Sequence, residues 1–149
     1  MSEYSGILQT VQPNENVLLT DVIPCTKGYV FHRNGSGILI LRGITGGCNT
    51  FARYQVTFNG NIALPEDAGA VTPISVSIAL DGEPLQSSKA VVTPAAVDEY
   101  FNVTTTAIIT VPKCCCATIA VENTSAAVGT TPAQAINVDN GNLTIARIA

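Results

Sequence analysis

Charged residues are scarce in this chain of 149 residues. They make up 12% of the sequence, whereas hydrophobic residues make up 46%, and typical soluble domains carry about a quarter charged residues. The length suits one domain with a substantial core and leaves no room for a second ordinary domain. A single domain with so few charged residues has a surface that water solvates poorly. The composition therefore predicts that copies of the chain cover part of one another's surface.

Basic residues are few, long apolar runs are absent, and the first residues do not predict a leader segment. Seven Lys plus Arg against eleven Asp plus Glu give a net charge of −4, which leaves no basic patch for gripping nucleic-acid phosphates. No apolar run approaches the roughly 18 residues of a membrane-spanning helix. The first residues, MSEYSGILQT, lack the basic and apolar regions of a secretory signal. We expect no nucleic-acid partner, no membrane partner, and assembly inside a cell.

Motifs of catalysis and of metal binding are absent as well. The chain has one histidine, His32, and no G-x-S-x-G motif that would supply a nucleophile beside it. The glycine runs at residues 35–37 and 46–47 are not followed by the Lys-Ser/Thr of a phosphate-binding loop. The carboxylate pairs Glu66-Asp67 and Asp98-Glu99 lack the spaced oxygen ligands that calcium needs. We therefore expect no catalytic residue, no metal ligand and no cofactor, and we expect His32 at a strand end on the surface.

Turn signals and β-branched residues dominate what is present. Dipeptides typical of hairpin turns occur at Asn34-Gly35, Asn59-Gly60, Asp81-Gly82 and Asn140-Gly141, and no segment keeps a helical period for more than about two turns. The pattern predicts an all-β chain folded as a two-sheet antiparallel jelly-roll sandwich. The predicted strands are residues 7–11, 16–22, 28–32, 37–41, 52–58, 74–80, 90–93, 100–105, 107–111, 117–122 and 142–148.

Alternation assigns faces to some of these strands. In ARYQVTF, alternation places Ala52, Tyr54, Val56 and Phe58 on a core side and Arg53, Gln55 and Thr57 on a polar side. In ISVSIAL, Ile74, Val76, Ile78 and Leu80 are expected to point inward, while Ser75, Ser77 and Ala79 point outward. Small uncharged outward residues favour close approach of another copy, although a plain solvent-facing strand has the same pattern. The run GILILRGI is apolar at nearly every position, which predicts burial on both faces. Long loops are expected at residues 122–135 and 64–73, at the ends of the sandwich, where binding residues commonly lie.

Several of these stretches resemble the trimeric jelly rolls of the tumour necrosis factor and complement C1q-like class, in particular the C-terminal domains of bacterial exosporium collagen-like glycoproteins. The resemblance spans roughly residues 27–149. It rests on Tyr54 and Val56 in a G-x-Y-x-V/I strand, on Ile78, Leu80, Asp81, Gly82 and Pro84 across a tight turn, and on Leu143, Ile145 and Ile148 in a closing strand. It implies a homotrimer, and we predict its interface at Ser75, Ser77, Ala79, Tyr54 and Ile145.

The chain is also similar to small accessory proteins on the heads of tailed bacteriophages. This resemblance implies a structural virion protein, either a capsid decoration protein or a head-fibre component, with the major capsid protein or other virion proteins as partners. Residues 1–22 would then be an N-terminal arm in front of a jelly-roll domain of residues 23–149. In that arm, Tyr4, Ile7 and Leu8 would anchor the trimer to the capsid.

Two other roles stay open at this point. One is a carbohydrate- or receptor-binding trimeric module whose loops contact host surface glycans. The other is a spore or cell-surface layer protein. None of the three roles involves catalysis, so the fold-level resemblance does not choose among them.

Five cysteines, Cys25, Cys48, Cys114, Cys115 and Cys116, are the last feature of note. Adjacent residues on an extended chain point to opposite faces, so the three consecutive thiols cannot converge on one zinc ion. A disulfide from Cys25 or Cys48 to one of the three, or between copies of the chain, is one reading. Reduced thiols packed as small buried apolar residues are the other, and the sequence favours this second reading.

Overall fold

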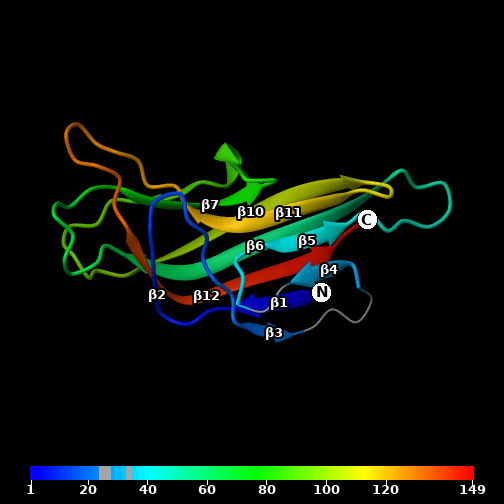
Figure 1. The fold of residues 1–149 in the computed structure, drawn as a ribbon, viewed down its shortest axis with the longest axis horizontal. Helices are drawn as coiled ribbons and strands as arrows, with labels where there is room; N and C mark the ends of the chain where they lie inside the picture. Colours follow the sequence, from blue (N-terminus) through cyan, green and yellow to red (C-terminus); the bar gives the residue numbers. More distant parts are fainter. Residues whose placement is uncertain (24–27, 33–34) are drawn as a thin grey trace.

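Two antiparallel sheets packed face to face make up the protein in the computed structural model, which describes residues 1–23, 28–32 and 35–149. Sheet A contains β1 (Ser2–Ser5), β2 (Gln9–Val11), β3 (Asp21–Ile23), β6 (Phe51–Ala63), β10 (Phe101–Pro112) and β12 (Ile136–Arg147). Sheet B contains β4 (Val30–His32), β5 (Leu39–Arg42), β7 (Ile74–Leu80), β8 (Glu83–Pro84), β9 (Ala90–Val92) and β11 (Cys116–Asn123). The predicted all-β jelly-roll sandwich is confirmed (Figure 1).

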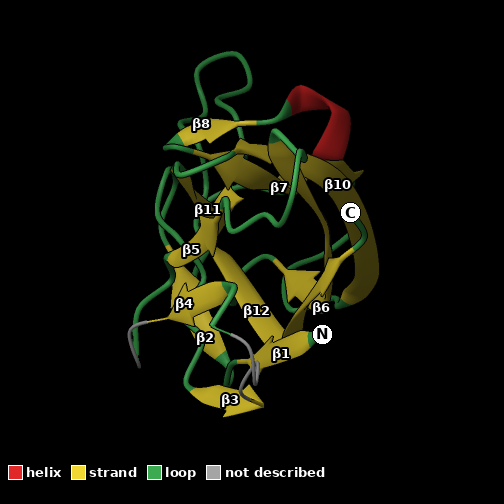
Figure 2. Cartoon of the chain, turned by 90° about the vertical axis from the view of Figure 1, so that its right-hand side faces the viewer, coloured by secondary structure: helices red, strands yellow, loops and turns green. Residues whose placement is uncertain are grey.

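The order of strands in each sheet explains which segments meet. Sheet A runs β10-β6-β12-β1-β3 with β2 beside β12, and sheet B runs β4-β5-β11-β7-β8 with β9 beside β7. The two layers are seen edge-on in Figure 2. The only helical segment among the described residues is a single 3₁₀ turn, Gln86–Ser88. No helix in the described part of the chain has the length and apolar character needed to cross a bilayer.

Some strands are longer than the sequence pattern indicates. The strands predicted at 100–105 and 107–111 form one strand, β10, paired with β6 along its whole length. Asn59-Gly60 lies inside β6 rather than in a turn, and Asn140-Gly141 lies at a register shift within β12. Asp81-Gly82 does form the predicted hairpin turn, since both residues have positive φ and connect β7 to β8. The prediction at Asn34-Gly35 lies partly outside the described residues.

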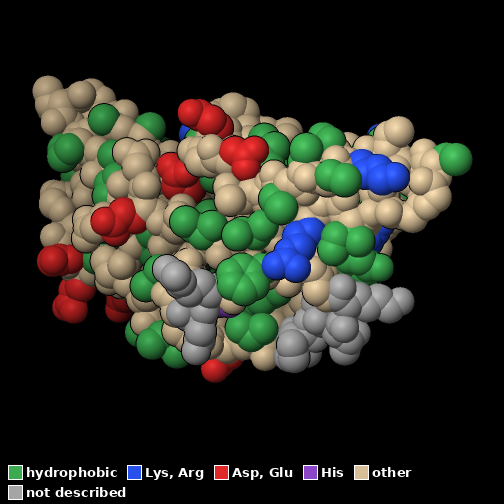
Figure 3. Space-filling view, turned by 45° about the vertical axis from the view of Figure 1, so that its right-hand side comes forward, with side chains coloured by type: hydrophobic (Ala, Val, Ile, Leu, Met, Phe, Trp, Pro, Cys, Tyr) green, Lys and Arg blue, Asp and Glu red, His purple; other side chains and the backbone are tan. Residues whose placement is uncertain are grey.

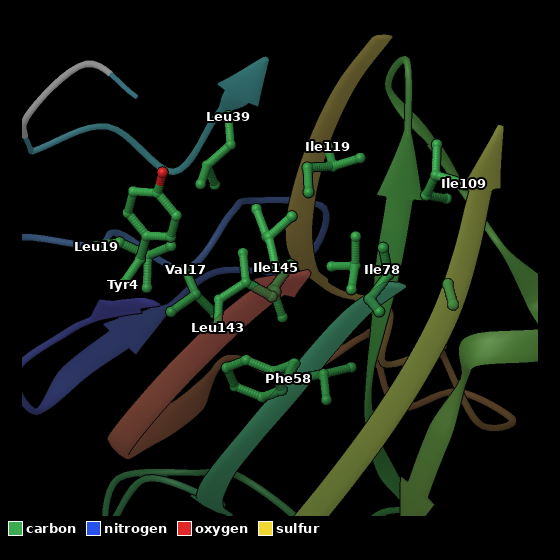
Figure 4. Packing of buried hydrophobic residues seen from close by; sticks show 14 of the residues in the cluster. Tyr4, Val17, Leu19, Leu39, Phe58, Ile78, Ile109, Ile119, Leu143 and Ile145 are labelled. Carbon is green, nitrogen blue, oxygen red and sulfur yellow. The ribbon is translucent and has the colours of Figure 1, made fainter. Parts of the chain in front are cut away.

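The core lies between the sheets and takes alternate residues from each long strand. In β6 the buried side chains are those of Ala52, Tyr54, Val56 and Phe58, as the alternation predicts. Figure 4 shows Phe58, Ile78, Ile119, Leu143 and Ile145 meeting from both sheets. Burying each such side chain stabilises the fold by roughly 1.5–3 kcal/mol relative to its exposure.

The N-terminal residues are an integral part of this sandwich. β1 pairs with β12 on one side and β3 on the other, and β2 pairs with the start of β12. Four side chains from this segment, Tyr4, Val11, Val17 and Leu19, belong to the core cluster. The described residues of this segment therefore pack within the same sandwich as the rest, and the division into an arm of residues 1–22 and a domain of residues 23–149 stays a prediction.

The two ends of the sandwich differ in character. The loops of residues 64–73, 93–100 and 124–135 lie together at one end, as the turns after β6 and β11 and before β10 require. At the other end, the loop of residues 43–50 lies beside the β10–β11 turn (Figure 1). We call these the loop end and the thiol end, because Cys48, Cys114, Cys115 and Cys116 are all at the second.

Candidate functional site

The residues predicted to form the trimer interface are buried inside the subunit. Ser75, Ser77, Ala79, Tyr54 and Ile145 are each at most 2% exposed. A side chain with no accessible surface in a single chain cannot contact a second copy while the subunit keeps this fold. The structure therefore corrects this prediction for all five residues.

The reason for the error differs between the strands. Along β7 the predicted alternation holds, because Ile74, Val76 and Ile78 are in the core cluster and the serines are not. The outward serines are covered by the residue after β11: Thr124 Oγ1 lies 2.9 Å from Ser75 Oγ and 3.0 Å from Ser77 Oγ. Tyr54 instead points into the core, where its hydroxyl donates a 2.5 Å hydrogen bond to the Arg42 carbonyl.

The three residues of the predicted capsid anchor differ in exposure. Tyr4 is 2% exposed and packs edge-on against His32, with ring centroids 5.1 Å apart, so its prediction as an anchor is wrong. Ile7 and Leu8 are exposed, in the short connection between β1 and β2. Their anchoring role stays a prediction.

A rigid contact places a third aliphatic side chain beside this pair. The Gln9 side chain accepts a hydrogen bond from Leu18 N and donates one to Leu18 O, each 2.8 Å long. The two segments are so close that a Cβ on Gly6 would lie 2.5 Å from Leu18 O. Ile7, Leu8 and Leu18 therefore form one exposed aliphatic cluster on a fixed backbone.

Further exposed apolar side chains lie on the outer face of sheet B, beyond a polar stretch that contains Asn14, Glu15, Asn16 and Ser36. Leu18 and Ile38 line one hollow of about 460 Å³, and Ile38, Ile40 and Phe31 line a second of about 330 Å³. We call Ile7, Leu8, Leu18, Ile38, Ile40 and Phe31 the apolar band; five of them, all but Ile40, are 47–67% exposed. Figure 3 shows hydrophobic side chains running through the middle of this view. The predicted burial of GILILRGI on both faces is therefore wrong, since only Leu39 and Leu41 face the core.

The part of the outer face of sheet A that β6 and β10 form has a different character and is nearly uncharged. We call the outward residues of β6 and β10 the neutral face: Phe51, Arg53, Gln55, Thr57, Asn59, Asn61, Asn102, Thr104, Thr106, Ile108, Thr110 and Pro112. Arg53 is the only charged residue among them, and its guanidinium lies over the Phe51 ring at 5.0 Å. The face spans the full length of the sandwich.

Polar side chains on the neutral face already bond to one another. Thr57 Oγ1 and Thr106 Oγ1 are 3.1 Å apart, and Asn102 Nδ2 donates to Asn59 Oδ1 at 2.9 Å and to Asn61 Oδ1 at 3.1 Å. Groups paired in this way lose little when water is removed, because their hydrogen bonds remain. The neutral face is therefore suited to burial against protein.

A smaller polar hollow lies on sheet B next to the apolar band. It has a volume of about 290 Å³, and Asn16, Ile38, Ala79, Asp81 and Thr118 are among its lining residues. Asp81 Oδ1 accepts hydrogen bonds from Thr118 N at 2.8 Å and Thr118 Oγ1 at 3.2 Å. The carboxylate is therefore held in one orientation at the rim of a space of monosaccharide size.

One carboxyl group of sheet B, that of Glu122, has a shifted pKa. Glu122 of β11 is 8% exposed and pairs with Ser77 across the sheet. Burial, with a smaller contribution from the nearby Glu83 charge, raises the pKa of the Glu122 carboxyl. The structure gives this group no metal or nucleophile to act on among the described residues, so we treat the shift as a matter of stability.

The cysteines contradict the buried-thiol reading. Cys48, Cys114, Cys115 and Cys116 are all free and exposed, whereas free cysteines are usually among the most buried residues. Cys25 lies outside the described residues. Three of these thiols are exposed because they occupy the tip of the β10–β11 hairpin, a position that the sequence places between two strands without indicating its exposure.

Potential metal ligands and the one histidine are the next feature of the described residues. No cluster of three or more His, Cys, Asp or Glu side chains there is placed to hold a metal ion. His32 lies at the end of β4, half-buried, with Nε2 2.8 Å from the Ser36 carbonyl oxygen. The Glu99 carboxylate accepts a 2.9 Å hydrogen bond from Ala95 N and so orders its own loop.

Sequence reasoning missed most of the apolar band and the neutral face. Leu18, Phe31, Ile38 and Ile40 carry no local sign that they are exposed, because exposure depends on which distant segment covers them. The neutral face did have a signal. The run TTTAIIT is rich in threonine and isoleucine and contains no charged residue, which is unusual for a surface strand.

Comparison with known proteins supports the fold. No protein-family model matches the chain, and no curated protein matches it in sequence. The solved globular domain of zebrafish complement 1qA protein is similar, with a TM-score of 0.54 and 13% sequence identity over 97% of this chain and 96% of that chain.

Two weaker structural likenesses involve domains described as sugar-binding. The EclA C-terminal domain, a sugar-binding protein, has a TM-score of 0.43 and 18% identity over 93% of this chain and 76% of that chain. The CBM22-1 xylan-binding domain from Paenibacillus barcinonensis Xyn10C has a TM-score of 0.35 and 12% identity over 98% of each chain. The fold of this chain is accordingly that of a C1q/TNF-like jelly-roll sandwich.

Proposed function

We propose that the protein is a structural module that assembles into a homotrimer and decorates a bacteriophage capsid. In this proposal the neutral face joins the subunits, and the apolar band attaches the trimer to the shell. The observation that carries the proposal is the neutral face, where one charged residue stands among twelve outward positions on two full-length strands.

The dimensions and chemistry of the neutral face favour a protein partner. Twelve residues of strand extend about 40 Å at roughly 3.3 Å per residue. At one end, Ile108, Pro112 and Phe51 lie on adjoining rows with Ile148, which follows β12 and whose backbone N bonds to Arg53 O. An apolar end and an internally bonded polar remainder resemble the core and the surrounds of a protein interface.

Attachment to the shell is assigned to the apolar band. The backbone at Leu18 is held by its hydrogen bonds to the Gln9 side chain, so little backbone entropy is lost there on binding. Isolated exposed apolar residues need no explanation, but several of them near one another on a protein with few charges favour a contact surface. Assembly in the host cytoplasm and final location in the virion follow from this proposal.

The mass of the purified protein in solution tests the trimer. Light scattering at several concentrations is expected to give three times the 15.5 kDa mass of one chain. Ile108→Arg places a charge in the apolar part of the proposed interface and is expected to shift the mass to that of a monomer. Val91→Arg, at a similarly exposed position on sheet B, is the matched control and should leave the trimer intact. A monomeric wild-type protein would refute the assembly.

The virion role needs a separate experiment. Particles purified from the virus that encodes the chain are expected to contain it in fixed proportion to the capsid protein. Leu8→Glu in the apolar band should remove the protein from the particle without changing its oligomeric mass. Absence of the wild-type protein from clean particles would refute the capsid role while leaving the trimer untouched.

A second candidate, glycan binding, is favoured by the hollow beside Asp81. A fixed carboxylate and the Asn16 amide could bond sugar hydroxyls there, while Ile38 contacts the apolar side of the ring. Glycan-array binding that Asp81→Ala abolishes would support this role. Retention of binding in that variant would place any glycan elsewhere. A spore or cell-surface layer role predicts instead that the protein copurifies with envelope material.

A further inference from the structure

The thiol end carries a group of residues that the proposed function does not use. Cys114, Cys115 and Cys116 follow one another through the β10–β11 turn, and Cys48 lies in the adjacent loop. All four thiols are exposed and free. Exposed thiols are open to oxidation and exchange, so a group of them at one end of the molecule calls for a chemical explanation.

The backbone of this turn is fixed from two sides. Cys115 N donates to Pro112 O at 3.0 Å within the turn. Across to the neighbouring loop, Gly43 N donates to Cys115 O at 2.8 Å and Cys114 N donates to Gly43 O at 3.0 Å. Cys114 has a φ of 64°, a conformation that favours glycine. The sequence therefore keeps a thiol where glycine would fit the backbone better.

Bonds between neighbouring thiols of the turn are disfavoured by geometry. Consecutive Cα atoms are about 3.8 Å apart across a trans peptide, and a disulfide usually needs about 4.4–6.8 Å. The peptide bonds of the described residues are trans. A sulfur partner for Cys115 or Cys116 must therefore come from beyond its immediate neighbours in sequence.

Basic side chains lie at this end of the sandwich. Arg42 is directly opposite Cys116 in the β5–β11 register, on the outer face of sheet B, and its guanidinium lies 5.9 Å from the Phe31 ring centroid and donates a 3.4 Å hydrogen bond to Gly28 O. Lys113, Arg53 and Arg147 are at the same end of the sandwich. Figure 3 shows most basic side chains toward this end and acidic ones toward the other. The Asp81 carboxylate, at the end of β7 on the other side of β11 from β5, bonds to Thr118.

We propose that this turn is a thiol–disulfide exchange site for an anionic low-molecular-weight disulfide, with Cys116 forming the mixed disulfide. The Cys116 thiol releases its proton to solvent, and the thiolate attacks one sulfur of RS–SR. The S–S bond of the small molecule breaks, a new S–S bond joins R to Cys116, and RS⁻ leaves and takes up a proton. The small disulfide is the oxidant, so no other is needed.

Arg42 supplies the selectivity of the site. A unit charge about 6 Å from an opposite charge in water changes an equilibrium about threefold, and each additional cation at this end adds to the attraction. The effect falls as salt screens the charges. An anionic disulfide should therefore react faster at Cys116 than a neutral disulfide of similar size, and the preference should require Arg42.

Two single-thiol proteins test the site. In the first, Cys25, Cys48, Cys114 and Cys115 are replaced by serine so that only Cys116 remains; in the second, Cys48 alone remains. Each is treated with oxidised glutathione, which is anionic, or with the neutral bis(2-hydroxyethyl) disulfide, and adduct formation is followed by mass spectrometry. Thermal unfolding first establishes that both variants fold.

The expected result is a ratio of anionic to neutral rates at least about threefold higher for Cys116 than for Cys48. Arg42→Gln in the Cys116 protein, or about 0.5 M salt, should bring that ratio close to the Cys48 value. Equal ratios at the two thiols would overturn the proposal. A ratio at Cys116 that Arg42→Gln leaves unchanged would overturn it as well. Both outcomes are independent of whether the protein is a trimer or binds a capsid.

Discussion

Replacing Gly43 by alanine should loosen the whole thiol end of the sandwich. Gly43 follows β5 and lies against the β10–β11 turn, where a Cβ would stand 1.9 Å from Pro112 O and 3.0 Å from Cys115 O. Both neighbours are backbone atoms, so no side-chain rotation relieves the clash. The loop and the turn must separate by more than about 1 Å to restore ordinary van der Waals contact.

The cost follows from the contacts that such a separation breaks. Gly43 N to Cys115 O and Cys114 N to Gly43 O are the two hydrogen bonds between these segments at that point. Each contributes about 0.5–1.5 kcal/mol net, so losing both costs about 1–3 kcal/mol. For a chain of this size the corresponding fall in Tm is roughly 2–12 °C.

Gly46→Ala is the matched control in the same loop. A Cβ there meets no atom within 4 Å, so we expect unchanged or slightly raised stability. Thermal unfolding of both variants and the wild type at one protein concentration provides the measurement, because the Tm of an oligomer depends on concentration. A Gly43→Ala protein that melts within about 1 °C of wild type would show that the close approach is not real.

Two further substitutions test the interior. Because burial raises the pKa of Glu122 above its unfolded value, the native state favours the protonated carboxyl, and stability falls as pH rises through the native pKa. Glu122→Gln should therefore unfold at higher denaturant than wild type at neutral pH, with the difference vanishing in acid; a constant difference at all pH values would contradict this. Tyr54→Phe removes the donor to the Arg42 carbonyl and should cost about 1–3 kcal/mol in urea unfolding, whereas an unchanged midpoint would mean that water replaces the hydroxyl.

Much of the fold could be predicted because its signal is local. Alternation in β6 and β7 assigns Tyr54, Phe58 and Ile78 to the core without knowledge of any partner strand. Asp81-Gly82 encodes its turn in two residues that tolerate positive φ. The break predicted between residues 105 and 107 was wrong because pairing with β6 keeps β10 continuous, and no local pattern reveals a partner that far away in sequence.

The candidate surfaces depended on coverage, which is not a local property. The outward serines of β7 were predicted to contact another subunit. Thr124, nearly fifty residues later in the sequence, covers Ser75 and Ser77 instead. The reverse holds for Ile38, which the sequence predicted to be buried and which is 47% exposed.

By itself the sequence determined the β class, the inward set of residues and the shortage of charge that makes assembly attractive. These follow from side-chain period and composition, which need only neighbouring residues. The tertiary structure alone decided that Leu18 joins Ile7 and Leu8, that β6 and β10 share an uncharged face, and that Cys116 stands opposite Arg42. Each of these depends on register and on chain crossings between distant segments, where the free energy is set by packing of the whole sandwich.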